Sequence, residues 1–94
     1  MRYISLMPFV RLLTWDAWNV AHIALHGVAP EEVEEVCHGE PVTSSAYNGR
    51  IRIIGPTLSG RMLTVILAPA HRPGIYYPVT ARPADRKERR NYAR

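Results

Sequence analysis

Apolar positions recur at helical spacing in the first part of the chain, where two short segments each have one hydrophobic side. Asp16 is expected to cap a helix from Ala17 to Leu25, since aspartate accepts hydrogen bonds from the free N–H groups of a first turn. Gly27 is expected to end this helix, because glycine readily adopts the left-handed conformation found there. Helical spacing predicts an inward face made of Val20, Ile23 and Ala24, flanked by Trp18 and Leu25.

A second helix is predicted from Pro30 to the residue before Gly39. Proline suits a first helical position, and Glu31 and Glu32 suit the positive end of the helix dipole. The pattern places Val33, Val36 and Cys37 inward, and Glu31, Glu34 and Glu35 outward. Ahead of both helices, residues 8–15 (PFVRLLTW) have the composition of an edge or terminal strand.

After Pro41 the pattern changes to strand-like alternation. Asn48-Gly49 lies between two such segments and predicts a β-hairpin turn, because both central residues of a type I′ turn need positive φ. In the strand that follows, Arg50 and Arg52 are predicted to share one face, opposite Ile51 and Ile53. Residues 61–69 are almost entirely apolar and predict the central strand.

A last strand and a last helix are predicted in the C-terminal part of the chain, where Pro78 and Pro83 affect their positions. Residues 75–81 form a strand that Pro78 weakens or bulges, and Pro83 is expected at the first position of a final helix. The predicted fold class is α+β: an antiparallel sheet of about four strands, two N-terminal helices and one C-terminal helix. The length of 94 residues and the apolar content of 47% predict a single domain over residues 1–94.

The number of cysteines and the N-terminal segment indicate in which cellular compartment the protein is expected. Cys37 is the only cysteine, which excludes an internal disulfide and fits a reducing cytoplasm. The apolar N-terminus is interrupted by Pro8 and Arg11 and no small-residue cleavage site follows, so we expect no signal peptide. No stretch approaches the roughly 20 apolar residues of a membrane span, and no membrane partner is expected.

Charge is divided unequally along the chain. Residues 1–40 hold two arginines against six acids, whereas residues 41–94 hold ten basic residues against two acids. If a helix begins at Pro83, then Arg82, Arg86 and Arg90 lie along one stripe of it, where their like charges repel. Asp85 can form an ion pair with Arg89, four residues later, but with no arginine of the stripe. The stripe predicts contact with a polyanion, either RNA phosphates or an acidic protein; the alternative is a solvated helix face.

Three groups of residues resemble BrnT-type toxins, in the order found in that family. The resemblance runs from about Leu13 to Tyr92, nearly the whole chain. The residues that carry it are Trp15, Asp16, Asn19, His26, Gly27, Val28 and Val33, then Arg50, Arg52, Ile54, Gly55, Gly60, Arg61, Leu63 and Val65, and finally Val79, Ala81, Arg82, Ala84, Glu88 and Tyr92. Leu25 stands where the family usually has lysine, and Thr80 where it usually has serine.

The resemblance implies a RelE-like fold, a ribonuclease activity that inhibits translation and growth, and a cognate antitoxin that neutralises this activity. It also implies that the chain forms a dimer or a toxin–antitoxin hetero-oligomer. Arg61 and Arg82 are then the candidates for stabilising the pentavalent phosphate, and Glu88 for the general base. Tyr92 is a candidate for base stacking or proton donation, and His26 for a role near RNA. The RNA-binding candidates are Arg50, Arg52, Arg86, Lys87, Arg89 and Arg90.

Several alternatives stay open at this stage. A salt bridge that orients an arginine is the preferred reading of Glu88 over base catalysis, and Tyr92 is read equally well as a residue that packs the last helix onto the sheet. The loss of lysine at Leu25 favours a homologue that only binds RNA or protein. A DNA-binding accessory factor is a weaker reading, because the second helix is acidic and phosphates would repel it.

Metal and cofactor chemistry find little support in the sequence. His22 and His26 have a spacing that suits two metal ligands on one helix face, but no third ligand completes the set. The chain has no glycine-rich phosphate loop, nucleophile elbow or dinucleotide fingerprint. The sequence therefore predicts a metal-independent protein without a cofactor.

Overall fold

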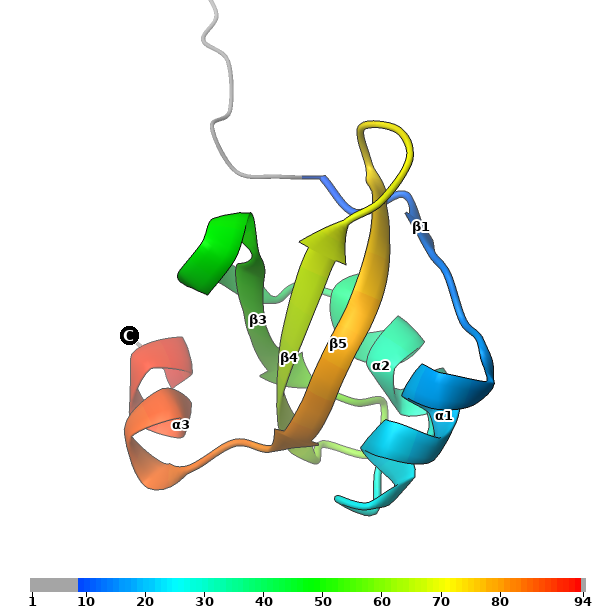
Figure 1. The fold of residues 1–94 in the computed structure, drawn as a ribbon. Helices are drawn as coiled ribbons and strands as arrows, with labels where there is room; N and C mark the ends of the chain where they lie inside the picture. The colour runs from blue at the N-terminus through cyan, green and yellow to red at the C-terminus, as the bar shows by residue number, and fades with distance from the viewer. Residues whose placement is uncertain (1–8, 94) are drawn as a thin grey trace, which may run out of the picture.

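A computed structural model describes residues 9–93 of the chain. Over these residues the fold is α+β, with three α-helices and a five-stranded sheet (Figure 1). The helices and strands are, in chain order, β1 (Leu12–Leu13), α1 (Ala17–Ala24), α2 (Pro30–Cys37), β2 (Val42–Ser45), β3 (Ile51–Pro56), β4 (Met62–Pro69), β5 (Ile75–Pro83) and α3 (Arg86–Ala93).

The sheet is mixed rather than wholly antiparallel. Its strand order is β1-β5-β4-β3-β2, which makes β4 the central strand, as predicted. The pairs among β2, β3, β4 and β5 are antiparallel, but β1 runs parallel to β5. The expected antiparallel sheet of about four strands is corrected to five strands. The fifth strand, β1, is a two-residue edge strand within the predicted strand segment 8–15. Pro8, the first residue of that segment, lies outside the described residues. Most of the N-terminal segment on which the expectation of no signal peptide rests also lies outside them.

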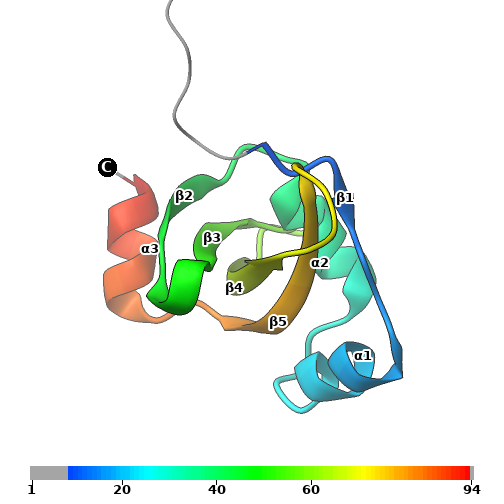
Figure 2. The ribbon, with the colours of Figure 1, turned by 45° about the horizontal axis from the view of Figure 1, so that its top comes forward.

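The two faces of the sheet carry different helices. Leu63, Val65 and Leu67 of β4 point into the main hydrophobic core, which α1 and α2 cover. Thr64 and Ile66 point to the opposite face, where α3 contacts β3. Figures 1 and 2 show α3 and α1 on opposite sides of the sheet. Among residues 9–93, no helix is long and apolar enough to cross a membrane.

The inward face of α1 differs from the prediction. Asp16 caps the helix as expected, but the buried residues are Asn19 and Ile23, while Ala24 is exposed and Val20 is 38% exposed. The Asn19 side-chain amide donates to the carbonyl oxygens of Thr14 and Pro78, at 3.0 and 3.2 Å. These bonds satisfy buried backbone acceptors and turn the helix so that Val20 faces outward.

The predicted turn at Asn48-Gly49 is confirmed. Asn48 has φ 54° and Gly49 has φ 75°, and the Arg50 N–H donates to the Tyr47 carbonyl at 3.0 Å. The hairpin loop is one residue longer than a two-residue turn requires, since Ser45 pairs with Ile51. This offset decides which β2 side chains lie beside Arg52, because a shift of one residue moves a strand's side chains to the other face.

Two prolines of β5 have distinct effects. The pairing with β4 shifts by one residue at Pro78, which confirms the predicted irregularity. Pro83 does not begin the last helix: it pairs with Leu63 as the final residue of β5. The helix starts after Asp85, whose carboxylate accepts the Glu88 N–H at 2.8 Å while the Glu88 carboxylate accepts the Asp85 N–H at 2.9 Å. The predicted stripe is therefore broken, because Arg82 belongs to the strand.

Candidate nucleic-acid interface

Arg82 and Glu88 join the end of the sheet to α3. Arg82 lies opposite Thr64 of β4, and its guanidinium donates two hydrogen bonds of 2.8 Å to the two carboxylate oxygens of Glu88. The guanidinium also donates to the Pro83 carbonyl at 3.2 Å. This two-pronged geometry is the arrangement in which arginine binds carboxylates and phosphates most strongly.

The ion pair changes the acidity of Glu88. The hydrogen bonds from Arg82, aided by the Asp85 N–H, outweigh the effect of partial burial and lower the pKa of Glu88 to about 2. In the same contact, the pKa of Arg82 is raised, chiefly by its hydrogen bonds to Glu88. The carboxylate therefore holds its proton too weakly to act as a base near neutral pH while the pair is closed. In this arrangement Glu88 positions Arg82.

The remaining basic residues of α3 face outward. Arg86, Lys87, Arg89 and Arg90 are all exposed, and the helix buries no residue completely. Arg89 donates to the Ala84 carbonyl at 2.7 Å, and Asp85 serves as the helix cap instead of pairing with it. Tyr92 is half-buried and donates its hydroxyl to the Glu40 carbonyl at 3.0 Å. Tyr92 thus fixes the end of α3 against the turn that precedes β2.

Arg52 and Arg50 extend the basic surface across the sheet. Arg52 lies on the α3 side of β3, between Ser44 and Ile66 of the neighbouring strands. Arg50 lies at the hairpin, with its guanidinium 5.0 Å from the centre of the Tyr47 ring. The Nε atom of Arg50 is buried and has no hydrogen-bond partner among the described residues. Neither arginine forms an ion pair within residues 9–93.

Arg61 and His26 lie apart from this surface. The Arg61 guanidinium points to the opposite side of the sheet, where it donates to the Gly27 carbonyl at 2.9 Å and pairs with Glu32 at 3.1 Å. His26 follows α1 beside the same turn. The predicted catalytic residues therefore fall into two groups: Arg82, Glu88 and Tyr92 around α3, and Arg61 and His26 around the turn between α1 and α2.

The histidines of α1 form an aromatic row with Trp18. The rings of Trp18 and His22 are stacked with centroids 4.6 Å apart, and His26 meets His22 edge to face at 6.1 Å. Within the described residues, no group of three or more His, Cys, Asp or Glu side chains is placed to hold a metal ion. The spacing of His22 and His26 is thus used for ring contacts.

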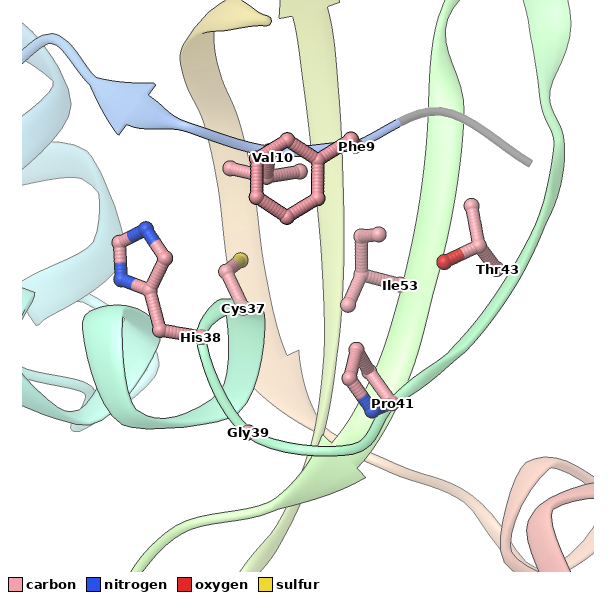
Figure 3. Close-up of a pocket in the computed structure, with 8 residues that line it drawn as sticks. All are labelled: Phe9, Val10, Cys37, His38, Gly39, Pro41, Thr43 and Ile53. Atoms are coloured by element: carbon pink, nitrogen blue, oxygen red, sulfur yellow. The ribbon is translucent and has the colours of Figure 1, made fainter. Parts of the chain in front are cut away.

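A cavity of about 370 Å³ lies on the α2 side of β2 and β3, where Thr43 and Ile53 line it. Figure 3 shows Cys37 pointing toward Phe9 and Val10, with Ile53 on the sheet side. Burial raises the pKa of the Cys37 thiol to about 12, so almost none of it is thiolate near neutral pH. The other lining residues are mostly apolar, and the His38 imidazole in the lining lies 3.2 Å from a Glu34 carboxylate oxygen.

A groove between α3 and the sheet adds residues that the sequence pattern missed. It has a volume of about 410 Å³ and includes Ser44 from β2 and Asn91 from α3. Ser44 lies directly opposite Arg52. A simple two-residue turn at Asn48-Gly49 would instead place Ser45 opposite Arg52, because the register of β2 against β3 would differ by one residue. The signal that identifies Asn91 is its position four residues after Lys87 on the helix.

No protein-family model matches the chain, and no curated protein is similar to it. The candidate site consists of an arginine fork held by Glu88, with the partly buried Arg50 and Arg52 beside β3 and exposed cations on α3. Such a surface suits a phosphate-bearing polymer, because arginines and lysines without carboxylate partners pair readily with phosphates.

Proposed function

We propose that this chain is a RelE-like ribonuclease toxin of the BrnT type, which cleaves RNA and is neutralised by a cognate antitoxin. One observation carries the proposal. Arg52 and Lys87 line the same groove as Glu88, Arg86 and Arg90 are exposed on the same helix, and no ion pair within residues 9–93 engages any of the four. Charge of this density without acidic partners favours a polyanion, and arginine forks favour its phosphates.

Arg82 has the chemistry to promote cleavage at a phosphate. When the RNA 2′-hydroxyl oxygen attacks the neighbouring phosphorus, negative charge grows on the phosphate oxygens, and a guanidinium stabilises it through two hydrogen bonds. The bond from phosphorus to the 5′-oxygen then breaks, which leaves a 2′,3′-cyclic phosphate and a 5′-hydroxyl that takes its proton from water. A phosphate that takes the place of Glu88 on Arg82 frees that carboxylate. The pKa of Glu88 then rises toward its ordinary value, and the carboxylate can accept the 2′-hydroxyl proton.

A second function, RNA binding without cleavage, is favoured by a different observation. Glu88 and Tyr92 both have protein partners, and the four histidines lie on α1, just after α1, just after α2 and in the loop before β5. Among the described residues of the α3 side, the carboxylates of Asp85 and Glu88 both accept hydrogen bonds from protein groups while the ion pair is closed. Leu25, which is 79% exposed, also lacks the charge that the family usually has there.

Gel-resolved cleavage of a labelled structured RNA, in EDTA, tests the proposal. The wild type should cut the RNA, and Arg82→Ala/Arg86→Ala should not. Arg72→Ala, which removes an exposed arginine from the loop before β5, is the matched control and should cut like the wild type. Intact RNA with folded, RNA-binding wild type would favour the binding function, and cutting by the double variant would contradict the assigned role of Arg82.

A further inference from the structure

The groove between α3 and the sheet has an apolar floor. Val42 of β2 and Ile54 of β3 are cross-strand partners, and both side chains line the groove. Val42 is 42% exposed, whereas Ile54 is only 5% exposed. A volume of about 410 Å³ lies within the usual range of small-molecule sites, which is roughly 300–1,000 Å³. The groove therefore has room for one small ligand, with an apolar contact surface at Val42 and Ile54.

The walls of the groove are polar, and their groups are available. Ser44 and Arg52 form the cross-strand pair next to the apolar one, and Lys87 and Asn91 face it from successive turns of α3. Among residues 9–93, the side chains of these four residues make no hydrogen bond or ion pair. The two acids of the groove, Asp85 and Glu88, already accept hydrogen bonds from the helix start and from Arg82.

This combination selects a particular class of ligand. Two cations without carboxylate partners favour an anion such as a phosphate, whereas the Val42–Ile54 floor favours an apolar, flat group. A hydroxyl and an amide, which both donate and accept, favour a partner with donors and acceptors along one edge. A nucleotide unites all three features, and an acidic peptide lacks the flat apolar part.

We propose that the groove binds a single nucleotide of the RNA strand, which rests on the proposed function of this surface. The phosphate lies between Arg52 and Lys87, the base lies over Val42 and Ile54, and the edge of the base meets Asn91 and Ser44. Asn91 then selects among bases, because an amide that finds no matching donor or acceptor loses its hydrogen bonds to water without replacement.

Titration of the full-length, isotope-labelled chain with 5′-AMP, 5′-GMP, 5′-CMP, 5′-UMP and inorganic phosphate tests this site. We expect at least one nucleotide to bind tenfold or more tightly than inorganic phosphate, with chemical-shift changes centred on Val42, Ser44 and Asn91. Asn91→Ala should reduce the differences among the four nucleotides to less than about threefold. Equal binding of all nucleotides and inorganic phosphate would overturn the proposal.

Two matched variants separate groove binding from general charge. Val42→Glu places an acid in the groove and should weaken nucleotide binding at least tenfold. Ser45→Glu adds the same charge to the same strand outside the groove and should change binding less than threefold. The dispersion of the amide spectrum confirms that each variant is folded. Equal losses in both variants would show that the effect is long-range charge, against the proposal.

The outcomes distinguish this proposal from the proposed function. Nucleotide binding with the expected variant pattern, beside RNA that stays intact, supports the groove and rejects the ribonuclease. RNA cleavage with the same KM in Val42→Glu and wild type supports the ribonuclease and rejects the groove. Binding of a polyglutamate peptide, but of no nucleotide, with shifts at the same residues assigns the groove to an acidic protein partner and also rejects the proposal.

Discussion

The guanidinium of Arg82 and the carboxylate of Glu88 form two parallel hydrogen bonds of 2.8 Å between the last residues of β5 and the first turn of α3. Only a few other contacts hold this helix, chiefly the hydrogen bond from Tyr92 to the Glu40 carbonyl and that from Arg89 to the Ala84 carbonyl. Because α3 buries no residue completely, apolar packing contributes little to holding it on the sheet. The Arg82–Glu88 ion pair therefore contributes more to the position of α3 than a surface ion pair usually contributes to the position of a helix.

The first prediction concerns the pH dependence of stability. The pKa of Glu88 is about 2 in the folded chain against an ordinary 4.5, so its stabilising effect is complete above pH 4.5 and is lost as the pH falls toward 2. Because the Arg82 side chain is 40% exposed, solvent reduces this effect to about 1 kcal/mol. Because Asp16 and Glu32 also have lowered pKa values, urea unfolding at pH 7 and at pH 2.5 should show a loss in both proteins, larger by about 1 kcal/mol in wild type than in Glu88→Gln. The same loss in both would contradict the role of Glu88.

The second prediction concerns Asn19. Its replacement by alanine leaves the Thr14 and Pro78 carbonyls and the Asp16 N–H without their side-chain partner. We expect the free energy of unfolding to fall by about 2–3 kcal/mol, since buried polar groups that lose their partners are costly. Val20→Ala, next along the helix but outward-facing, should cost less than about 1 kcal/mol. Chemical denaturation compares them, and equal costs would contradict the observed face of α1.

The third prediction concerns the thiol of Cys37. A pKa of about 12 in place of 9.0 lowers the thiolate fraction near pH 8 about a thousandfold. Alkylation by iodoacetamide, followed by mass spectrometry, should therefore be at least a hundredfold slower in the native chain than in urea. Rapid labelling without urea would mean that the cavity beside Phe9 opens readily.

The fourth prediction concerns the salt dependence of RNA binding. Arg86 and Arg90 are exposed on α3. If each neutralises one phosphate, Arg86→Ala/Arg90→Ala should reduce the slope of log K against log salt by about 1–1.5 for single-stranded RNA. Fluorescence anisotropy at several salt concentrations measures this slope. Arg72→Ala should keep the wild-type slope, and a slope equally reduced by that variant would indicate that contact is spread over the whole surface.

Much of the fold is predictable because local signals are strong in this chain. Asp16, Pro30 and the Asn48-Gly49 pair each fix a helix start or a turn through their own backbone preferences, and all three are confirmed. The parallel pairing of β1 with β5 is not predictable in this way, since two residues carry no pattern and their partners are more than 60 positions distant. Tertiary hydrogen bonds to Asn19 likewise override the apolar periodicity of α1.

The candidate site depends still more on long-range pairing. The charge pattern indicates a basic surface, and Glu88 as the partner of an arginine is an alternative that the sequence alone suggests. The pattern cannot show that Arg82 ends a strand, since its position follows from pairing with Thr64 rather than from the residues beside it. Nor can it show that Arg61 points away from Arg82, because this follows from the sheet's two faces and from the contact with Glu32.

The separation of charge between α2 and α3 has a kinetic consequence. The acidic helix α2 covers one face of the sheet and the basic helix α3 lies on the other face. These two sides of the molecule therefore carry opposite charge. In the field of a polyanion such a molecule experiences a torque that turns α3 forward before contact, which raises the fraction of collisions that are productive. If the partner is the polyanion proposed above, the acidic helix contributes to the orientation of the encounter without touching it.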